Sequence, residues 1–310
     1  MPLTVLFAAS NDDWHKYAPA LRDAFAEAAF NAELVTKAAP DTVDYIIYAP
    51  ASTLRDFTPF TRTKAVLSLW AGVETIVTNE TMTQPLARMV DPGMTQSMVE
   101  WVTGHVLRYH LGMDAHIVNP DRAWTWHSNP LASERSVCIL GLGELGQAVA
   151  RMLMSIGFRV SGWSRSPKSV DGVTCFSGAD GLKPALKTGE ITVLLLPDTS
   201  ETENALNAET LAELPRGAFL INPGRGPLID DSALIDALES GQVAHATLDV
   251  FRQEPLPRDH PFWEHPRVTV TPHIAAATRA VTSAAEIAKN ITRAEAGEPL
   301  LNLVDRARGY

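Results

Sequence analysis

Cysteine is scarce in this 310-residue chain. Its two cysteines, Cys138 and Cys175, are too distant in sequence for a clustered zinc site and too few for a disulfide scaffold. None of the nine histidines lies at metal-ligand spacing from another, so no metal site is predicted. No apolar run approaches the roughly 18 residues of a membrane-spanning helix. The first residues include no basic segment of the kind that begins a signal peptide, so none is expected. These absences favour a protein of the reducing cytoplasm without a membrane partner.

Positive charge is also in short supply. The chain has 26 Lys and Arg against 36 Asp and Glu, a formal net charge of −10. Such an acidic balance argues against a nucleic-acid partner, which would require basic patches. Hydrophobic residues make up 45% and charged residues 20%, as in an ordinary soluble globular protein. At roughly 150 residues per domain, the length predicts two domains.

Apolar β-prone runs alternate with helical patterns along most of the chain. This order is typical of βαβ units, so we expect an α/β protein with two doubly wound parallel-sheet domains. Strands are expected at residues 3–8, 45–48, 65–69, 136–140, 159–163, 191–196, 218–222, 246–250 and 268–271, and helices at 17–30, 96–110 and 278–295.

A chain-breaking sequence, Asp91-Pro92-Gly93, separates the two series of strands and predicts a domain boundary near residues 92–97. We expect one parallel-sheet domain over residues 96–276. The other is expected over residues 1–95, joined by residues 277–310 if the last helix returns to it.

The second series opens with a nucleotide-binding fingerprint. The strand at 136–140 runs directly into G-x-G-x-x-G, and a helical pattern follows, which is the context that this motif requires. The first glycine allows a tight turn, the second lets the backbone approach a pyrophosphate, and the third allows close helix packing. The alternative is a glycine-rich turn without a ligand. The residues expected to bind a dinucleotide are Gly141, Gly143, Glu144, Leu145 and Gly146.

The next strand indicates which dinucleotide is bound. An NAD site usually offers a carboxylate here to the ribose hydroxyls, but this segment has none before Asp171. Ser164, Arg165 and Lys168 can instead hold a 2′-phosphate through charge-assisted hydrogen bonds. The alternative is an exposed basic loop without a ligand. We expect NADP(H) to be preferred, with NAD(H) possible.

Three later strands lead into residues whose side chains can bind a carboxylate or transfer a proton. Arg225 follows the first of them, the second carries Asp249 near its end and Glu254 just beyond it, and His273 follows the third. An arginine fork suits a carboxylate, and a histidine oriented by a carboxylate transfers protons near neutral pH. Each residue alone has a purely structural explanation: a surface arginine, a helix-capping glutamate or a core histidine. Because ligands bind at the carboxyl ends of strands in such sheets, we expect the residues to share one crevice with the glycine loop.

The sequence resembles the D-isomer-specific 2-hydroxyacid dehydrogenases, and within that family the glyoxylate/hydroxypyruvate reductase A group. It departs from the family pattern at Glu74, where Asp is common, and at Pro223-Gly224, where a small or apolar residue followed by Ala is more frequent. The motifs that carry the resemblance are LWAGVE (69–74), GLGELG (141–146), GWSRSPK (162–168), LLLPDT (194–199), NPGRGPLID (222–230), LDVFRQEPLP (248–257), HPRVTVTPHIAA (265–276) and VDRARGY (304–310).

The resemblance implies a role for each of the three catalytic candidates. His273 would protonate the keto oxygen as a hydride arrives from the nicotinamide, and Glu254 would keep that histidine protonated. Arg225 would hold the substrate carboxylate and polarise the carbonyl. Further implied contacts are the backbone amides of Ala71, Gly72 and Val73 for the carboxylate, Asp249 for the nicotinamide amide and Pro197 for the cofactor wall. The resemblance also implies a Rossmann-type cofactor domain over residues 96–276 and a flavodoxin-like substrate domain over residues 1–95 and 277–310. Trp70, beside the three amides, is expected to narrow the pocket and favour small keto acids.

The expected function is therefore reduction of a small 2-keto acid by NADPH: glyoxylate to glycolate, or hydroxypyruvate to D-glycerate. The family implies a homodimer in which an aromatic residue, Trp124 or Trp126, reaches the partner's site; simple packing of both is the alternative. Two other functions stay open. One is the same chemistry on a bulkier acid such as phenylpyruvate or 2-ketogluconate, and the other is a non-catalytic NAD(P)-sensing protein.

Overall fold

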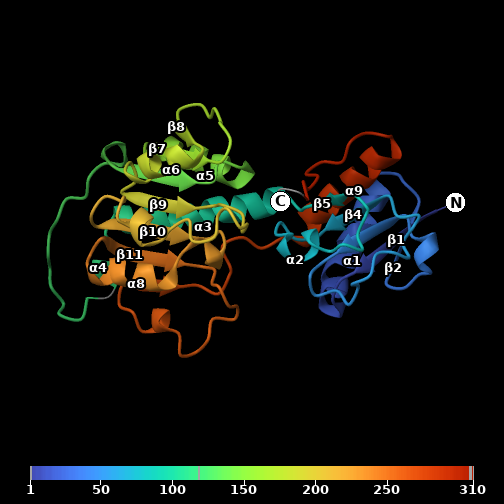
Figure 1. The fold of residues 1–310 in the computed structure, drawn as a ribbon, viewed down its shortest axis with the longest axis horizontal. Helices are drawn as coiled ribbons and strands as arrows, with labels where there is room; N and C mark the ends of the chain where they lie inside the picture. Colours follow the sequence, from blue (N-terminus) through green and yellow to red (C-terminus); the bar gives the residue numbers. More distant parts are fainter. Residues whose placement is uncertain (1, 118, 307–308, 310) are drawn as a thin grey trace. The chain divides into compact units, whose positions relative to one another are not determined.

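The computed structural model describes residues 2–117, 119–306 and 309. It divides into two compact units, one formed by Met1–Met94 with Ala277–Tyr310 and the other by Thr95–Ala276. Each unit is built on its own parallel β-sheet with helices packed on it, which confirms the predicted fold class (Figure 1). The terminal motif at 304–310 lies partly outside the described residues.

The described part of the first unit contains a five-stranded parallel sheet in the order β2-β1-β3-β4-β5. Helix α9, from the far end of the sequence, packs against α1, and both contribute buried apolar residues to one core. The elements of this unit are β1 (Leu3–Ala8), α1 (Asn11–Glu27), β2 (Ala32–Val35), η1 (Pro40–Thr42), β3 (Tyr45–Tyr48), β4 (Ala65–Ser68), α2 (Glu74–Val77), β5 (Leu86–Ala87) and α9 (Ala280–Glu295).

The described part of the second unit contains a seven-stranded parallel sheet in the order β12-β11-β10-β9-β6-β7-β8. The strand order reverses beside β6, which lies between β7 and β9. Its strands are β6 (Ser136–Leu140), β7 (Arg159–Ser164), β8 (Thr174–Ser177), β9 (Ile191–Leu194), β10 (Ala218–Asn222), β11 (Val243–Leu248) and β12 (Val268–Val270). Its helices are α4 (Asp114–Ile117), η2 (Ala132–Glu134), α5 (Glu144–Ile156), α6 (Ala179–Leu186), α7 (Ala208–Leu211), η3 (Gly226–Leu228), α8 (Asp231–Glu239) and η4 (Pro261–Trp263), while α3 (Pro92–His110) starts at the boundary between the units.

The central strands of both sheets are apolar on both faces because helices cover both faces. Every residue of β3, β4 and β9 is buried. Helix α5 is amphipathic: Val149, Ala150 and Leu153 pack into the core, and the helix ends at Gly157, whose φ of 110° suits a residue without a side chain. Because the strands are buried on both faces, the sheet holds the loops at the ends of its strands in place.

Element boundaries differ from the sequence prediction where capping decides them. Helix α1 starts at Asn11, not near residue 17, because Ser10 and Asp13 form a reciprocal capping box. Helix α3 likewise starts earlier, at Pro92, a residue suited to the first turn of a helix. The prediction missed β2, β5 and β8, which have two to four residues and too little periodicity to be recognised.

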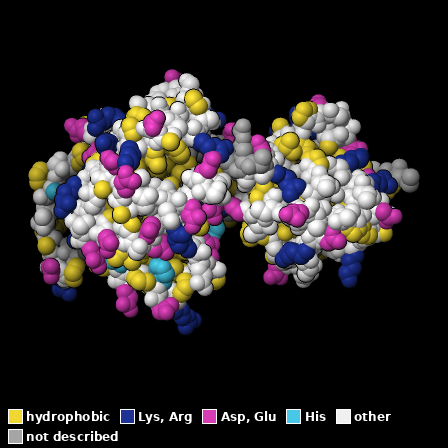
Figure 2. Space-filling model, in the orientation of Figure 1, with side chains coloured by type: hydrophobic (Ala, Val, Ile, Leu, Met, Phe, Trp, Pro, Cys, Tyr) yellow, Lys and Arg dark blue, Asp and Glu magenta, His cyan; other side chains and the backbone are white. Residues whose placement is uncertain are grey.

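Charges of both signs are interspersed on the visible face of each unit (Figure 2). Among the described residues, no helix combines the length and the apolar character that crossing a membrane requires.

Candidate active site

Seven candidate positions of the second unit lie at or just beyond the carboxyl ends of its strands. The strands are parallel, so their carboxyl ends meet at one edge of the sheet, where ligands of open α/β sheets bind. The glycine loop follows β6, Ser164 ends β7 and Arg165 follows it, Pro197 follows β9, Arg225 follows β10, Asp249 follows β11, and His273 follows β12.

The glycine loop has the shape that a pyrophosphate needs. A Cβ on Gly141, whose φ is 111°, would lie 2.4 Å from the Leu195 carbonyl oxygen, and one on Gly146 would lie 1.9 Å from that of Gly141. Gly143 caps the N-terminus of α5, and apart from Gly143 and its two chain neighbours, no described residue has a heavy atom within 4 Å of where its Cβ would be. Tight packing at two glycines and open space at the third leave the helix N-terminus accessible to an anion.

The end of β7 carries the candidate contacts to the ribose. The Ser164 side chain is buried, and its hydroxyl donates to the Ser166 carbonyl at 2.8 Å. Lys168 is exposed. The Arg165 guanidinium donates from Nη1 to a Glu201 carboxylate oxygen at 2.8 Å. Sequence analysis missed this carboxylate because Glu201 lies 36 residues further along the chain.

His273 and Glu254 form a hydrogen-bonded pair. His273 Nδ1 lies 2.7 Å from Glu254 Oε2, while Oε1 of the same carboxylate accepts the Phe251 backbone N–H at 3.0 Å. An ionised carboxylate can only accept, so Nδ1 carries the shared hydrogen and Nε2 is the nitrogen left for a ligand. The His273 side chain is 48% exposed, which leaves room for a reacting molecule beside it.

The backbone of His273 is held in an unusual conformation. Its φ is 53°, in the left-handed region, which costs of order 1–3 kcal/mol for a residue with a side chain. Its N–H donates to the Asp249 carbonyl at 2.8 Å and to the Thr271 carbonyl at 3.1 Å. These bonds fix the backbone at His273, and the bond from Nδ1 to Glu254 orients the imidazole. No sequence pattern indicated this conformation.

Asp249 anchors the segment that carries His273. Its side chain is completely buried and accepts the Thr271 hydroxyl at 2.5 Å, the Ile274 N–H at 2.9 Å and the Ala275 N–H at 2.8 Å. These three donors compensate for the burial of a carboxylate. The sequence predicted only a nicotinamide contact for Asp249 and missed its anchoring role.

Asn222, a buried residue that the sequence analysis did not single out, fixes the loop of Arg225. Its Nδ2 donates to the Arg225 carbonyl at 2.9 Å, and its Oδ1 accepts the Gly224 N–H at 3.1 Å. Its own carbonyl accepts the Asp249 N–H at 3.0 Å. Hydrogen bonds thus run from the Arg225 loop through Asn222 and Asp249 to His273. An asparagine at a strand end was the available signal.

Arg225 itself is partly exposed, and its Nη1 donates to the Gly224 carbonyl at 2.7 Å. The loop is packed too tightly for a side chain after the arginine, because a Cβ on Gly226 would lie 1.9 Å from the Phe251 carbonyl carbon. The Arg225 loop and the segment leading to Glu254 are therefore in direct backbone contact.

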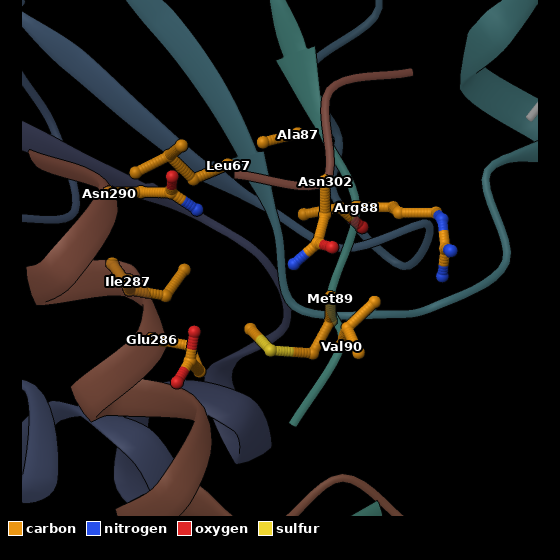
Figure 3. Close-up of a pocket in the computed structure, with 10 residues that line it drawn as sticks. Leu67, Ala87, Arg88, Met89, Val90, Glu286, Ile287, Asn290 and Asn302 are labelled. Carbon is orange, nitrogen blue, oxygen red and sulfur yellow. The ribbon is translucent and has the colours of Figure 1, made fainter. Parts of the chain in front are cut away.

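In the first unit, the loop Trp70–Val73 follows β4. The Trp70 carbonyl accepts the Met89 N–H at 3.0 Å and the Ser68 hydroxyl at 2.9 Å, while the residue as a whole is 45% exposed. Ala71 and Gly72 are partly exposed and Val73 is buried. A pocket between β4, β5 and α9 is lined by Ser68 and Met89 but by none of the predicted substrate residues (Figure 3).

The segment after α4 exposes two tryptophans. The exposed fraction is 100% for Trp124 and 83% for Trp126, so neither packs into a core of this chain.

Among the described residues, no group of three His, Cys, Asp or Glu side chains is arranged to hold a metal ion.

Comparison with known proteins agrees with this geometry. The family model "D-isomer specific 2-hydroxyacid dehydrogenase, NAD binding domain" matches residues 106–275. A glyoxylate/hydroxypyruvate reductase A from Serratia proteamaculans is 43% identical over 257 residues, which cover 80% of this chain and 82% of the relative. The chain belongs to the D-isomer-specific 2-hydroxyacid dehydrogenase family. The reductase of the same description from Yersinia enterocolitica is 41% identical over 80% of this dehydrogenase and 82% of the relative.

Solved structures of the family match this dehydrogenase along its length. A D-isomer-specific 2-hydroxyacid dehydrogenase from Xanthobacter autotrophicus, solved with NADPH and MES, has a TM-score of 0.91 at 39% identity, with 100% of both chains covered. An NADPH-dependent glyoxylate/hydroxypyruvate reductase from Sinorhizobium meliloti, solved with NADP and sulfate, has a TM-score of 0.85 at 32% identity, with 100% and 99% covered. The resemblance inferred from the sequence is confirmed, and so is the prediction of an NAD(P)-dependent oxidoreductase.

Proposed function

We propose that this dehydrogenase reduces small 2-keto acids with NADPH, converting glyoxylate to glycolate and hydroxypyruvate to D-glycerate. The observation that carries the proposal is the His273–Glu254 pair, 2.7 Å apart, at the same sheet edge as Arg225 and the glycine loop. The names of the relatives in Serratia and Yersinia support the choice of substrates.

NADP(H) is the preferred cofactor of this proposal, and NAD(H) is the second choice. The nicotinamide supplies the hydride for the reduction. Gly141, Gly143 and Gly146, with Glu144 and Leu145, form the pyrophosphate cradle. Relatives solved with NADPH or NADP support this choice. The remaining assigned contacts are Ser164, Arg165 and Lys168 to the 2′-phosphate and Pro197 to the wall of the cofactor site. Asp249 is completely buried and its carboxylate already accepts three hydrogen bonds, so we assign it to anchoring the His273 segment and not to direct contact with the nicotinamide.

Arg225 and His273 act on different groups of the substrate. The Arg225 guanidinium binds the substrate carboxylate and draws electron density from the neighbouring carbonyl. As negative charge develops on the keto oxygen, His273 gives it the proton from Nε2. The Glu254 carboxylate stabilises the positive imidazolium before that transfer. We assign the amides of Ala71, Gly72 and Val73 to the carboxylate and Trp70 to the limit on substrate length.

We further propose that the enzyme is a cytoplasmic homodimer. The exposed Trp124 and Trp126 support an interface, since a freely exposed indole is costly and aromatic residues are enriched where proteins associate. Light scattering of the purified protein should give twice the chain mass of 33.7 kDa. A mass of one chain at micromolar concentration would contradict the dimer.

The product formed from hydroxypyruvate tests the proposed function. Incubation of the purified enzyme with NADPH and hydroxypyruvate should yield glycerate in the D configuration, measured by chiral chromatography. A single configuration is expected because Arg225 would hold the substrate carboxylate while His273 would hold its keto oxygen, which fixes one orientation of the substrate. L-glycerate, or oxidation of NADPH without glycerate, would contradict the proposal.

A further inference from the structure

The ion pair between Arg165 and Glu201 joins two loops across the end of a third strand. Arg165 follows β7, and Glu201 lies in the loop after β9. Between these strands lies β6, which pairs with both and leads into the glycine loop. The Nη1–Oε2 contact of 2.8 Å therefore spans the edge of the sheet where the nucleotide is expected.

Glu201 reaches this position from a turn with a fixed backbone. The Thr202 hydroxyl donates to the Pro197 carbonyl at 2.7 Å, and the backbone N–H groups of Thr202 and Glu203 both donate to the Thr199 carbonyl at 3.0 Å. The turn is thus tied to Pro197, one of the residues assigned to the cofactor. The Glu201 side chain is 63% exposed, so its carboxylate can also turn away into water.

A second glutamate on the same turn points elsewhere. Glu203 is 58% exposed and lies 3.8 Å from the guanidinium of Arg252. Glu201 and Glu203 therefore have the same charge and similar exposure, but only Glu201 is paired with Arg165 in the structure. The two residues form a natural pair of test and control.

We propose that Glu201 sets cofactor specificity by competing with the ribose 2′-phosphate for the guanidinium of Arg165. This inference rests on the proposed NADP(H) function, through the assignment of Arg165 to that phosphate. A guanidinium has five N–H donors in a rigid fork, and the carboxylate already occupies Nη1. An arriving phosphate must displace the carboxylate or share the fork with it, and the two anions repel each other.

The competition acts on only one of the two cofactors. NADH carries a neutral 2′-hydroxyl, which neither repels the Glu201 carboxylate nor requires the charge of Arg165. Glu201 therefore lowers affinity for NADPH more than affinity for NADH, and it keeps the preference for NADPH below the level that Arg165 alone would give. Removing its charge is expected to sharpen that preference.

The test compares Glu201→Gln with Glu203→Gln, using 2′,5′-ADP and 5′-ADP as probes in calorimetric titrations of the purified enzyme at low ionic strength. These probes report on the adenosine end without any catalytic step. Because an exposed ion pair contributes modestly, Glu201→Gln should bind 2′,5′-ADP about two- to fivefold more tightly and leave 5′-ADP unchanged. Glu203→Gln should change neither, and the gain should shrink when added salt screens the charges.

The inference is overturned if Glu201→Gln binds 2′,5′-ADP no more tightly than Glu203→Gln does. An Arg165→Ala variant separates this failure from that of the proposed function. If Arg165→Ala weakens 2′,5′-ADP binding while Glu201→Gln has no effect, only the role of Glu201 is wrong. If Arg165→Ala changes nothing, the assignment of the 2′-phosphate is wrong. An equally large gain from Glu201→Gln in the Arg165→Ala background would show that Glu201 does not act through Arg165, and would also overturn the inference.

Discussion

Replacing His273 with alanine is expected to lower kcat for glyoxylate reduction by about 10²–10⁴-fold, because the variant lacks the positioned acid that protonates the keto oxygen. The pair geometry leaves Nε2 of His273 as the donor, since Nδ1 is bound to Glu254 at 2.7 Å. Initial rates at saturating substrate and NADPH measure the loss. A Glu254→Gln variant should show a smaller loss, because the imidazole remains but its charged partner is gone.

His260→Ala is the matched control for this experiment. His260 is another histidine beside a carboxylate, with its Nε2 3.6 Å from Asp231; it is only partly exposed and lies outside the proposed site. It should retain near-full turnover. If His273→Ala also retained near-full turnover, the acid would have to be another group and the proposed mechanism would be wrong.

Replacing Arg225 with alanine is expected to lower kcat/KM by about 10²–10⁴-fold. Two hydrogen bonds from the fork to a carboxylate are lost, each worth about 1.5–3 kcal/mol because both partners are charged. Arg225→Lys should recover only part of the loss, since an ammonium keeps the charge but cannot make the planar two-point contact. Steady-state kinetics with glyoxylate measure both variants.

Arg216 offers a control at the opposite end of the same strand. It precedes β10, whereas Arg225 follows it, and its side chain is exposed and donates to the Ser240 carbonyl. Arg216→Ala removes the same charge and should leave kcat/KM nearly unchanged. Equal values for the two alanine variants would show that Arg225 does not bind the substrate.

The sequence was most informative where a local pattern determines the structure. The strands at 3–8, 45–48, 136–140 and 218–222 were predicted with the bounds that the structure gives. These apolar runs are bounded by clear breaks in the sequence. A parallel strand buried on both faces is apolar at nearly every position, so it is recognised as such a run. The glycine loop was equally easy to recognise, because its spacing and its place between a strand and a helix are both local features.

The sequence was least informative about contacts between distant residues. The pairing of Arg165 with Glu201 and the burial of Asp249 under the His273 segment depend on how neighbouring strands align. The left-handed φ of His273 likewise follows from bonds to Asp249 and Thr271 and not from its own propensity. Predicting that Arg225 and His273 follow strands was possible. Asp249 was placed inside a strand predicted at 246–250, whereas β11 ends at Leu248 and Asp249 follows it. The hydrogen bonds that connect these residues could not be predicted.

The most direct test of the proposed function is a set of initial rates. Loss of absorbance would be followed with glyoxylate, hydroxypyruvate and phenylpyruvate, each with NADPH and with NADH. We expect fast reduction of glyoxylate or hydroxypyruvate with NADPH, slower rates with NADH, and little turnover of phenylpyruvate. Turnover of none of the three acids with either cofactor would contradict the central claim that this enzyme is a reductase of small 2-keto acids.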